Sequence, residues 1–291
     1  MKFGETIKKI RRDKNLTQAQ LSEGIMARNH LSQVENNNYF PSYDKFFLLI
    51  DRLNVNFEEF LYIQNHQKIL FTGKIHSQIS QAASLKNNEQ LYSLADEANN
   101  LYEQTGNISY YHYMLICRAL IAYNTDLTIN QDIIEFMSPI KDYLFKMENW
   151  YLYELKLFNN IIYSLTLEEA LLFSRTSLKR LETNKPFLEF QHIKQCIYTN
   201  LSTLCLEHGN FQAAKNFSKR AIKEAKKFSL IYEMVCSKLN YAIACIKLGE
   251  KGNACEVIEK NMSILEYLEL DNLYKHFSIF LKKLEITLDA T

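Results

Sequence analysis

A short segment near the start of the chain carries side chains that can read the edges of nucleic-acid bases. Within residues 27–36, Leu31 and Val34 have the spacing of one buried helical face. The polar side chains that point away from this face are Arg28, Asn29, Ser32 and Gln33. An arginine can donate two hydrogen bonds to guanine, and the carboxamide of asparagine or glutamine can pair with adenine. The segment is therefore a candidate recognition surface for DNA.

A second set of polar side chains recurs in the C-terminal half at a regular spacing. We call the distance along the sequence from Asn200 to Asn240 the repeat interval. Shifting the sequence by this interval also aligns nearby glycines, alanines and cysteines. Asn160 lies one repeat interval upstream of Asn200, and Arg118 lies slightly more than one interval before Asn160. Placed on the first helices of successive repeats, these side chains form a polar ladder of Arg118, Asn160, Asn200 and Asn240.

The ladder has the chemistry to hold an extended peptide. A carboxamide is both a donor and an acceptor, so it can pair with a peptide backbone whatever the side chains of that peptide are. An arginine can hold a carboxylate through two hydrogen bonds. A structural interpretation stays open, because repeats share their packing and an asparagine can simply bond a carbonyl of a neighbouring helix.

Catalytic chemistry is not indicated. The chain contains none of the short motifs of hydrolases, nucleotide-binding loops or zinc proteases. Its six cysteines form no C-x-x-C pair, and its seven histidines form no i, i+4 pair. We therefore expect reduced cysteines, no metal, no cofactor and no enzymatic activity.

Composition predicts that helices position these residues. Only 3 Pro and 7 Gly occur in 291 residues, which is too few for an all-β fold with many hairpins, and the hydrophobic content of 47% supports a large core. The formal net charge is +1, so only the basic N-terminal segment points to nucleic acid. No apolar stretch is long enough to cross a bilayer, and the start lacks the apolar region of a signal peptide. We expect a cytoplasmic protein without membrane contact.

The helical pattern divides into two predicted domains, residues 1–65 and residues 66–291. In the first, Thr17 with Gln20 and Asn56 with Glu59 have the spacing of helix caps, and the pattern predicts five short helices. The second domain shows a succession of helical segments with no linker before it. The predicted spans are 66–84, 88–104, 108–123, 130–146, 149–164, 167–183, 187–207, 211–227, 229–248, 252–267 and 270–288.

The first domain resembles the lambda-repressor-like helix-turn-helix family. The similarity is carried by Leu16-Thr17-Gln18, Leu21, Leu31-Ser32, Val34-Glu35-Asn36, Pro41-Ser42 and Leu53-Asn54-Val55. The resemblance implies that the third helix enters the major groove, and that Thr17 and Gln18 at the start of the second helix lie at a phosphate. It also implies that Arg11 and Glu35 form a buried ion pair that supports the fold. The alternative is a helix-turn-helix used only for protein contacts.

Two positions depart from that family pattern. The glycine usual in the turn before the third helix would stand at Ile25, whereas Gly24 lies one residue earlier. Ala27 occupies the place where a serine or threonine usually caps the third helix. These departures leave the start of the recognition helix undetermined by one residue.

The second domain is similar to degenerate tetratricopeptide repeats. The run GNFQAAKNFSKRAIKEA, residues 209–225, is close to the second half of such a repeat, with Ala214 where two helices approach closely. Stacked helix pairs of this kind build a right-handed superhelix with a concave inner face. The fold class that we predict is therefore all-α, a five-helix helix-turn-helix domain followed by this superhelix.

The whole chain resembles the Rgg family of Gram-positive bacteria, also through the Gly24-Ile25 turn and the aromatic run at residues 148–160. The resemblance implies a homodimeric transcription regulator that binds double-stranded DNA. It also implies that a short hydrophobic signalling peptide, as in quorum sensing, binds in the concave groove of the repeats. Two alternatives stay open: an adaptor whose groove binds a partner protein, and a regulator whose groove holds a small apolar ligand.

Overall fold

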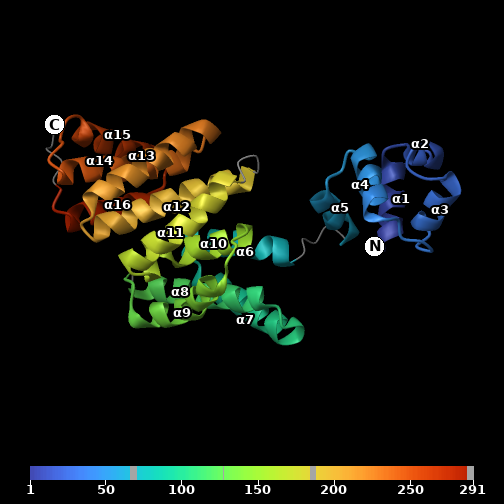
Figure 1. Ribbon diagram of the computed structural model, residues 1–291, viewed down its shortest axis with the longest axis horizontal. Coiled ribbons are helices and arrows are strands. Elements are labelled where there is room, and N and C mark those ends of the chain that lie inside the picture. Colours follow the sequence, from blue (N-terminus) through green and yellow to red (C-terminus); the bar gives the residue numbers. More distant parts are fainter. Residues whose placement is uncertain (66–70, 127, 184–187, 287–291) are drawn as a thin grey trace. The chain divides into compact units, whose positions relative to one another are not determined.

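Few breakers and long amphipathic segments produce a helical chain. The computed structural model describes residues 1–65, 71–126, 128–183 and 188–286, and within these ranges every regular element is a helix (Figure 1). The chain divides into two compact units, unit 1 (Met1–Gln81) and unit 2 (Ala82–Thr291). This division falls inside helix α6 (Phe71–Ser84), later than residue 65, where the sequence predicts the boundary.

Unit 1 begins with five short helices. They are α1 (Phe3–Asp13), α2 (Gln18–Ser22), α3 (Arg28–Glu35), α4 (Tyr43–Arg52) and α5 (Phe57–Gln64). Their apolar faces meet in one core that includes Ile7, Leu21, Leu31 and Val34, all of which are fully buried. The face of α3 that the sequence assigns to the interior therefore does point inward.

Side-chain caps set the starts of two of these helices. The Thr17 hydroxyl accepts a hydrogen bond from the backbone N–H of Gln20 at 3.2 Å, and the Gln20 side chain accepts one from the N–H of Thr17 at 2.8 Å. The Asn56 side chain accepts a hydrogen bond from the N–H of Glu59 at 2.8 Å. Both caps confirm the spacing seen in the sequence, because each satisfies a donor that the first turn leaves without a partner.

The turn before α3 settles the position of the recognition helix. Gly24 has a φ of +69°, a left-handed conformation that glycine adopts without strain. Ala27 is the residue that precedes the first turn of α3, and no side chain caps that turn. The helix-turn-helix is therefore closed by Gly24, one residue earlier than in the usual pattern, and α3 starts at Arg28.

Unit 2 is built from successive helices that pack against their neighbours in the chain. After α6 they are α7 (Asn88–Thr105), α8 (Ile108–Asp126), α9 (Gln131–Lys146), α10 (Leu152–Ile161), the 3-10 turn η1 (Ile162–Ser164), α11 (Leu167–Thr183), α12 (Leu188–Glu207), α13 (Phe211–Phe228), α14 (Ile231–Lys247), α15 (Ala254–Tyr267) and α16 (Asp271–Lys283). Helix α12 packs against α13 and α14, and α14 packs against α15 (Figure 1). These bounds agree closely with the sequence prediction, except that residues 66–70, 187 and 287–288 of the predicted spans lie outside the described residues.

The repeat interval of the sequence corresponds to a structural repeat. Gly209 and Gly249 both adopt positive φ, +71° and +78°, at the end of α12 and α14. The residue after each glycine donates its N–H to a cysteine carbonyl, at 2.8 Å for Cys205 and 2.9 Å for Cys245. Equivalent turns thus join equivalent helix pairs. Among the described residues, no helix combines the length and the apolar character needed to cross a membrane.

Candidate DNA-binding and ligand-binding sites

A hollow on unit 1 gathers most of the residues predicted to contact DNA. It has a volume of about 630 Å³ and lies where the start of α2 meets α1 and α3. Its lining residues are Lys8, Arg11, Arg12, Thr17, Gln18, Ala19, Arg28, Ser32, Glu35 and Asn36. The structure therefore brings the predicted phosphate contacts on α2 beside two of the predicted base contacts on α3.

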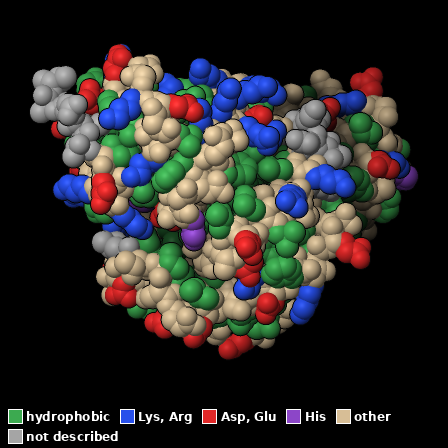
Figure 2. Space-filling model, turned by 60° about the vertical axis from the view of Figure 1, so that its left-hand side comes forward, with side chains coloured by type: hydrophobic (Ala, Val, Ile, Leu, Met, Phe, Trp, Pro, Cys, Tyr) green, Lys and Arg blue, Asp and Glu red, His purple; other side chains and the backbone are tan. Residues whose placement is uncertain are grey.

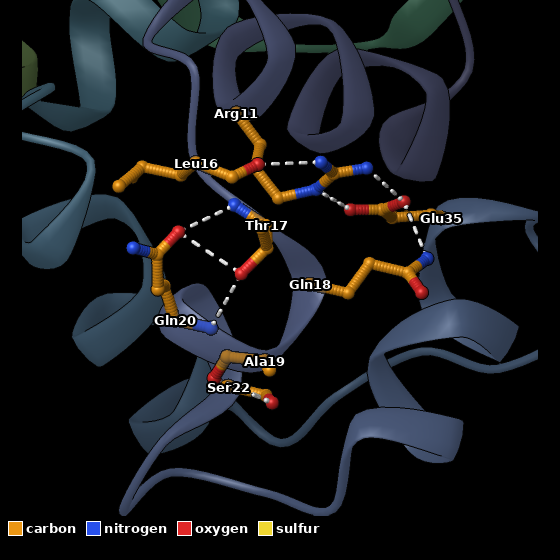
Figure 3. A network of polar contacts seen from close by, with 8 residues as sticks. All are labelled: Arg11, Leu16, Thr17, Gln18, Ala19, Gln20, Ser22 and Glu35. Atoms are coloured by element: carbon orange, nitrogen blue, oxygen red, sulfur yellow. Dashed lines mark hydrogen bonds and ion pairs between the residues drawn. The ribbon is translucent and has the colours of Figure 1, made fainter.

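A buried ion pair forms the floor of this hollow (Figure 3). Arg11 donates from Nε to Glu35 Oε1 at 2.5 Å and from Nη2 to Oε2 at 2.9 Å. A third bond, from Nη1 to the carbonyl of Leu16, measures 2.7 Å. Glu35 is 1% exposed, and its hydrogen bonds and charge raise the pKa of Arg11. The predicted pair thus ties α1 to α3 and to the segment that leads into α2.

The Gln18 side chain is oriented by the same carboxylate. Its Nε2 donates to Glu35 Oε2 at 2.9 Å, so one amide hydrogen is used inside the protein (Figure 3). A carboxamide nitrogen carries two hydrogens, and the second can be donated to a phosphate. Gln18 is also the first residue of α2, where free backbone N–H groups favour an anion.

The two amide residues predicted to read adenine lie on the exposed part of α3. Asn29 accepts a hydrogen bond from the N–H of His30 at 2.9 Å, and Gln33 accepts one from the Asn38 side chain at 3.1 Å. Neither side chain lines the hollow, and both are exposed. The structure thus separates them from the predicted phosphate contacts on α2.

Two basic residues of the hollow are absent from the sequence prediction. Lys8 and Arg12 lie one turn apart on α1 and both face the hollow beside Arg28. The local excess of positive charge is visible in the sequence, but the face that α1 presents is not. With these side chains the hollow offers several cations to a phosphate backbone.

Unit 2 contains a pocket lined mainly by amide, hydroxyl and aromatic side chains, which we name the amide pocket. Its volume is about 240 Å³. It is lined by Asn159, Tyr163, Gln195, Cys196, Thr199, Asn200, Thr203, Tyr232, Glu233, Cys236, Asn240, Leu273, His276 and Phe277. These residues come from α10, η1, α12, α14 and α16, so the first helices of successive pairs share one surface.

Two buried carboxamides join α12 to α14 under this pocket. Gln195 donates to the Glu233 carbonyl at 3.3 Å, and Asn240 donates to the Thr199 carbonyl at 3.4 Å. A carbonyl can only accept, so each amide nitrogen must face the neighbouring helix. The oxygens Gln195 Oε1 and Asn240 Oδ1 have no hydrogen-bond partner and are fully buried. An unsatisfied buried acceptor is unfavourable by about 1–3 kcal/mol, so both oxygens are a local cost to the packing of α12 against α14.

A second amide pair lies at the α10 side of the pocket. Asn200 donates to Asn159 Oδ1 at 3.0 Å and accepts a hydrogen bond from the Tyr163 hydroxyl at 2.8 Å. Asn159 rather than Asn160 lines the pocket; Asn160 lies half-buried beside it on α10. Of the predicted ladder, Asn200 and Asn240 are brought together. Sequence reasoning misses Gln195 and Asn159, because no carboxamide recurs one repeat interval after either of them.

His192 lies outside the lining of the amide pocket but contacts two residues that do line it, Cys196 and Glu233. His192 Nε2 lies 3.0 Å from Glu233 Oε1 and 3.9 Å from the sulfur of Cys196. The contacts with Cys196 and then with Glu233 raise the pKa of His192, and the bond from His192 lowers the pKa of Glu233. His192 and Glu233 therefore carry a matched pair of opposite charges at neutral pH.

Arg118 lies apart from the amide pocket. It is exposed and lines a different pocket of about 470 Å³, between α7, α8 and α9. The acidic residues Asp126 and Asp132 share that pocket with it. The structure thus places the predicted carboxylate contact and the two pocket asparagines in separate sites. Among the described residues, no group of three or more His, Cys, Asp or Glu side chains could hold a metal ion.

Comparisons with known proteins decide the family. Residues 94–279 match the C-terminal domain of the HTH-type transcriptional regulator Rgg, which is more than half of the chain. The chain belongs to the Rgg family. Residues 7–60 match a helix-turn-helix domain, so this Rgg protein carries the DNA-binding element together with the regulatory one. Membership makes it a transcriptional regulator and not an enzyme.

Solved structures share the fold over nearly the full length of this Rgg protein. A candidate transcriptional regulator from Listeria monocytogenes has 18% identity and a TM-score of 0.79, and the match covers 98% of this chain and 99% of that one. The SHP pheromone receptor Rgg2 of Streptococcus dysgalactiae has 17% identity and a TM-score of 0.72, covering 97% and 99%. PlcR of Bacillus thuringiensis, solved with the peptide PapR7 and DNA, has 15% identity and a TM-score of 0.67, covering 95% and 98%.

Proposed function

We propose that this Rgg protein binds a short peptide in the amide pocket and that occupancy of the pocket controls transcription from the DNA site read by α3. The observation that carries the proposal is the gathering of the carboxamides of Asn159, Asn200 and Asn240, from three successive first helices, on the lining of one pocket. A carboxamide both donates and accepts, so it can pair with the N–H and C=O groups that a peptide backbone supplies at regular intervals. The structure of PlcR, which has a related fold and contains the bound peptide PapR7, supports this choice of ligand.

The size of the pocket indicates how a peptide would bind. A volume of about 240 Å³ is smaller than a typical pocket for a whole small molecule. It would take one part of a peptide that lies along the inner side of α10, α12, α14 and α16. Leu273 and Phe277 on α16 give the pocket an apolar wall opposite the amides, which suits a hydrophobic peptide.

We also propose that the DNA-binding form is a cytoplasmic homodimer. A single recognition helix contacts only a few base pairs, and two of them linked in one dimer bind two half-sites together with a much higher combined affinity. In this proposal Arg28, Asn29, Ser32 and Gln33 read base edges, while Thr17 and Gln18 contact phosphate. The ladder residues Arg118 and Asn160 stay candidate peptide contacts outside the amide pocket.

A titration with synthetic hydrophobic peptides tests the peptide proposal. Isothermal titration of the full chain should show binding to at least one peptide, and Asn200→Ala should weaken it at least tenfold, since Asn200 is half-exposed at the pocket. Thr166→Ala is a matched control, because this residue is exposed and polar but caps α11 away from the pocket. If Asn200→Ala melts several degrees lower and keeps its peptide affinity, the asparagine is structural and the proposal is wrong. Binding of small apolar ligands or of a folded partner, but of no peptide, would favour the two alternative functions.

A further inference from the structure

The exposed face of α13 carries a row of positive charges that neither of the two sites uses. Small side chains at a helical spacing hold the opposite face against its neighbours: Ala214, Ser218, Ala221 and Ala225 are all buried. The exposed basic side chains between and beyond them are Lys219, Arg220, Lys223, Lys226 and Lys227. We name this row the α13 stripe. Figure 2 shows Lys and Arg side chains gathered along the upper edge of the face that it displays.

The charges of the α13 stripe are not neutralised within the part of the chain that the structure describes. None of its five side chains takes part in an ion pair there, and Glu224, the acidic residue of α13 itself, is already engaged. Glu224 binds Lys194 at 3.0 Å, and Glu250 binds Lys215, which lies outside the stripe. In a chain with a formal net charge of only +1, this stripe is a strong local asymmetry.

We propose that the α13 stripe binds the phosphate backbone of DNA, as a contact independent of base sequence and additional to the helix-turn-helix. Nine helical residues rise about 12 Å, and one DNA strand carries about one charge per 3.4 Å of axis, so the stripe faces three or four phosphates. The inference rests on DNA binding by this Rgg protein, and it extends that binding to unit 2.

The composition of the stripe favours DNA over two other anionic partners. Its exposed face contains no large apolar side chain between Gln212 and Lys227, whereas membrane-binding helices and protein interfaces need such anchors. Phosphate contacts need only flexible cations. A weak contact through the stripe also becomes effective when unit 1 already holds the same DNA molecule, because the stripe then binds within an existing complex.

The salt dependence of DNA binding tests this contact. The triple variant Lys219→Gln, Arg220→Gln, Lys223→Gln should bind every duplex more weakly, with an unchanged preference between sequences. The slope of log affinity against log salt should fall by about 0.9 for each lost contact. With three lost contacts, the wild type should lose affinity with added salt more steeply than the variant. The ratio of wild-type to variant affinity should therefore be about 40-fold smaller at about 200 mM salt than at about 50 mM salt.

A matched variant separates this effect from overall charge. A second triple variant removes three positive charges from exposed positions elsewhere in unit 2: Lys251→Gln, Lys275→Gln, Lys282→Gln. This variant should leave the slope at its wild-type value. Circular dichroism melts check that both variants stay folded. Equal slopes for wild type and the α13 variant, or an equal change in both variants, would overturn the proposal. The slope can be read on any duplex, so it is informative even if no peptide binds and no operator is preferred.

Discussion

At the scale of single residues, the ion pair of Arg11 and Glu35 is the most constrained feature of unit 1. Both side chains are buried, and the carboxylate receives bonds from Arg11 and Gln18. Arg11→Met would leave a buried charge without its partner, and we expect the free energy of unfolding of unit 1 to fall by about 3–5 kcal/mol. Hydrogen exchange of the α1 and α3 amides would measure this loss. Adding Glu35→Leu should recover much of it, and a double variant as unstable as the single one would contradict this expectation.

The residues at the DNA surface divide into two classes with different signatures. Asn29→Ala or Gln33→Ala should weaken binding to the operator by about 1–3 kcal/mol, because each removes a contact with a base edge. Gln18→Ala should weaken binding to all sequences alike, because we propose that its second amide hydrogen binds a phosphate. Fluorescence anisotropy with operator and scrambled duplexes distinguishes them. Equal losses on both duplexes for both classes would show that the division of roles is wrong.

His112 gives unit 2 a definite dependence on pH. It is 1% exposed and lies 2.7 Å from the Tyr153 hydroxyl, and burial lowers the pKa of its ring to about 4. Below about pH 6.5 the unfolded chain, whose histidine pKa is about 6.5, binds a proton at this residue, whereas the folded chain does not until the pH nears 4. The contribution of neutral His112 to the free energy of unfolding is therefore complete above about pH 6.5. It is lost as the pH falls toward 4, by up to about 1.4 kcal/mol per pH unit. Urea unfolding at several pH values should show a shallower loss for His112→Gln than for wild type.

Single residues also show how far sequence reasoning reaches. Asn200 and Asn240 can be predicted as neighbours because the repeat interval brings equivalent positions of two repeats together. The roles of Gln195 and Asn159 cannot, since no carboxamide recurs one repeat interval after them: Val235 and Thr199 stand there. Spacing alone predicts Arg118 as a ladder residue. Its distance from Asn160 differs from the repeat interval, however, and each step along a helix rotates the side-chain direction about the helix axis. Arg118 therefore faces a different pocket.

At the scale of elements, the closest approach in unit 1 is between α1 and the end of α3. A Cβ at Gly4 would stand 1.8 Å from the carbonyl oxygen of Val34, and the N–H of Gly4 bonds the Asn37 side chain at 2.8 Å. We expect Gly4→Ala to lower the stability of unit 1 by about 3 kcal/mol, because the backbone must move apart. Gly24→Ala is the comparison: its Cβ meets nothing within 4 Å, so only the positive φ of +69° opposes it, at about 1 kcal/mol. Thermal melts that rank the two variants in the reverse order would contradict this packing.

The helices themselves are largely predictable. Caps and turn glycines are local signals, so the starts of α2 and α5 and the ends of α12 and α14 follow from the sequence. The sequence pattern starts α10 too early because Trp150, which is 2% exposed, packs into the core from outside the helix. The predicted boundary at residue 65 stays a prediction, and the division into two compact units falls inside α6.

At the scale of the whole molecule, we propose that the reading surface in unit 1 is coupled to the amide pocket in unit 2. Thermodynamic linkage then makes a quantitative prediction. If a peptide changes the affinity for operator DNA by a given factor, operator DNA must change the affinity for that peptide by the same factor. Titrations of peptide with and without saturating operator measure this, and Asn200→Ala should reduce the affinity in both. A peptide that binds equally with and without DNA would show that the pocket does not control the reading surface.

The most direct test of the central claim is selection of bound duplexes from a random library by the full-length protein, at low salt, with and without its peptide. We predict enrichment of one motif with two related half-sites. This enrichment should disappear with Asn29→Ala, while nonspecific binding persists. Recovery of no preferred sequence under either condition would contradict the claim that α3 reads DNA for this regulator.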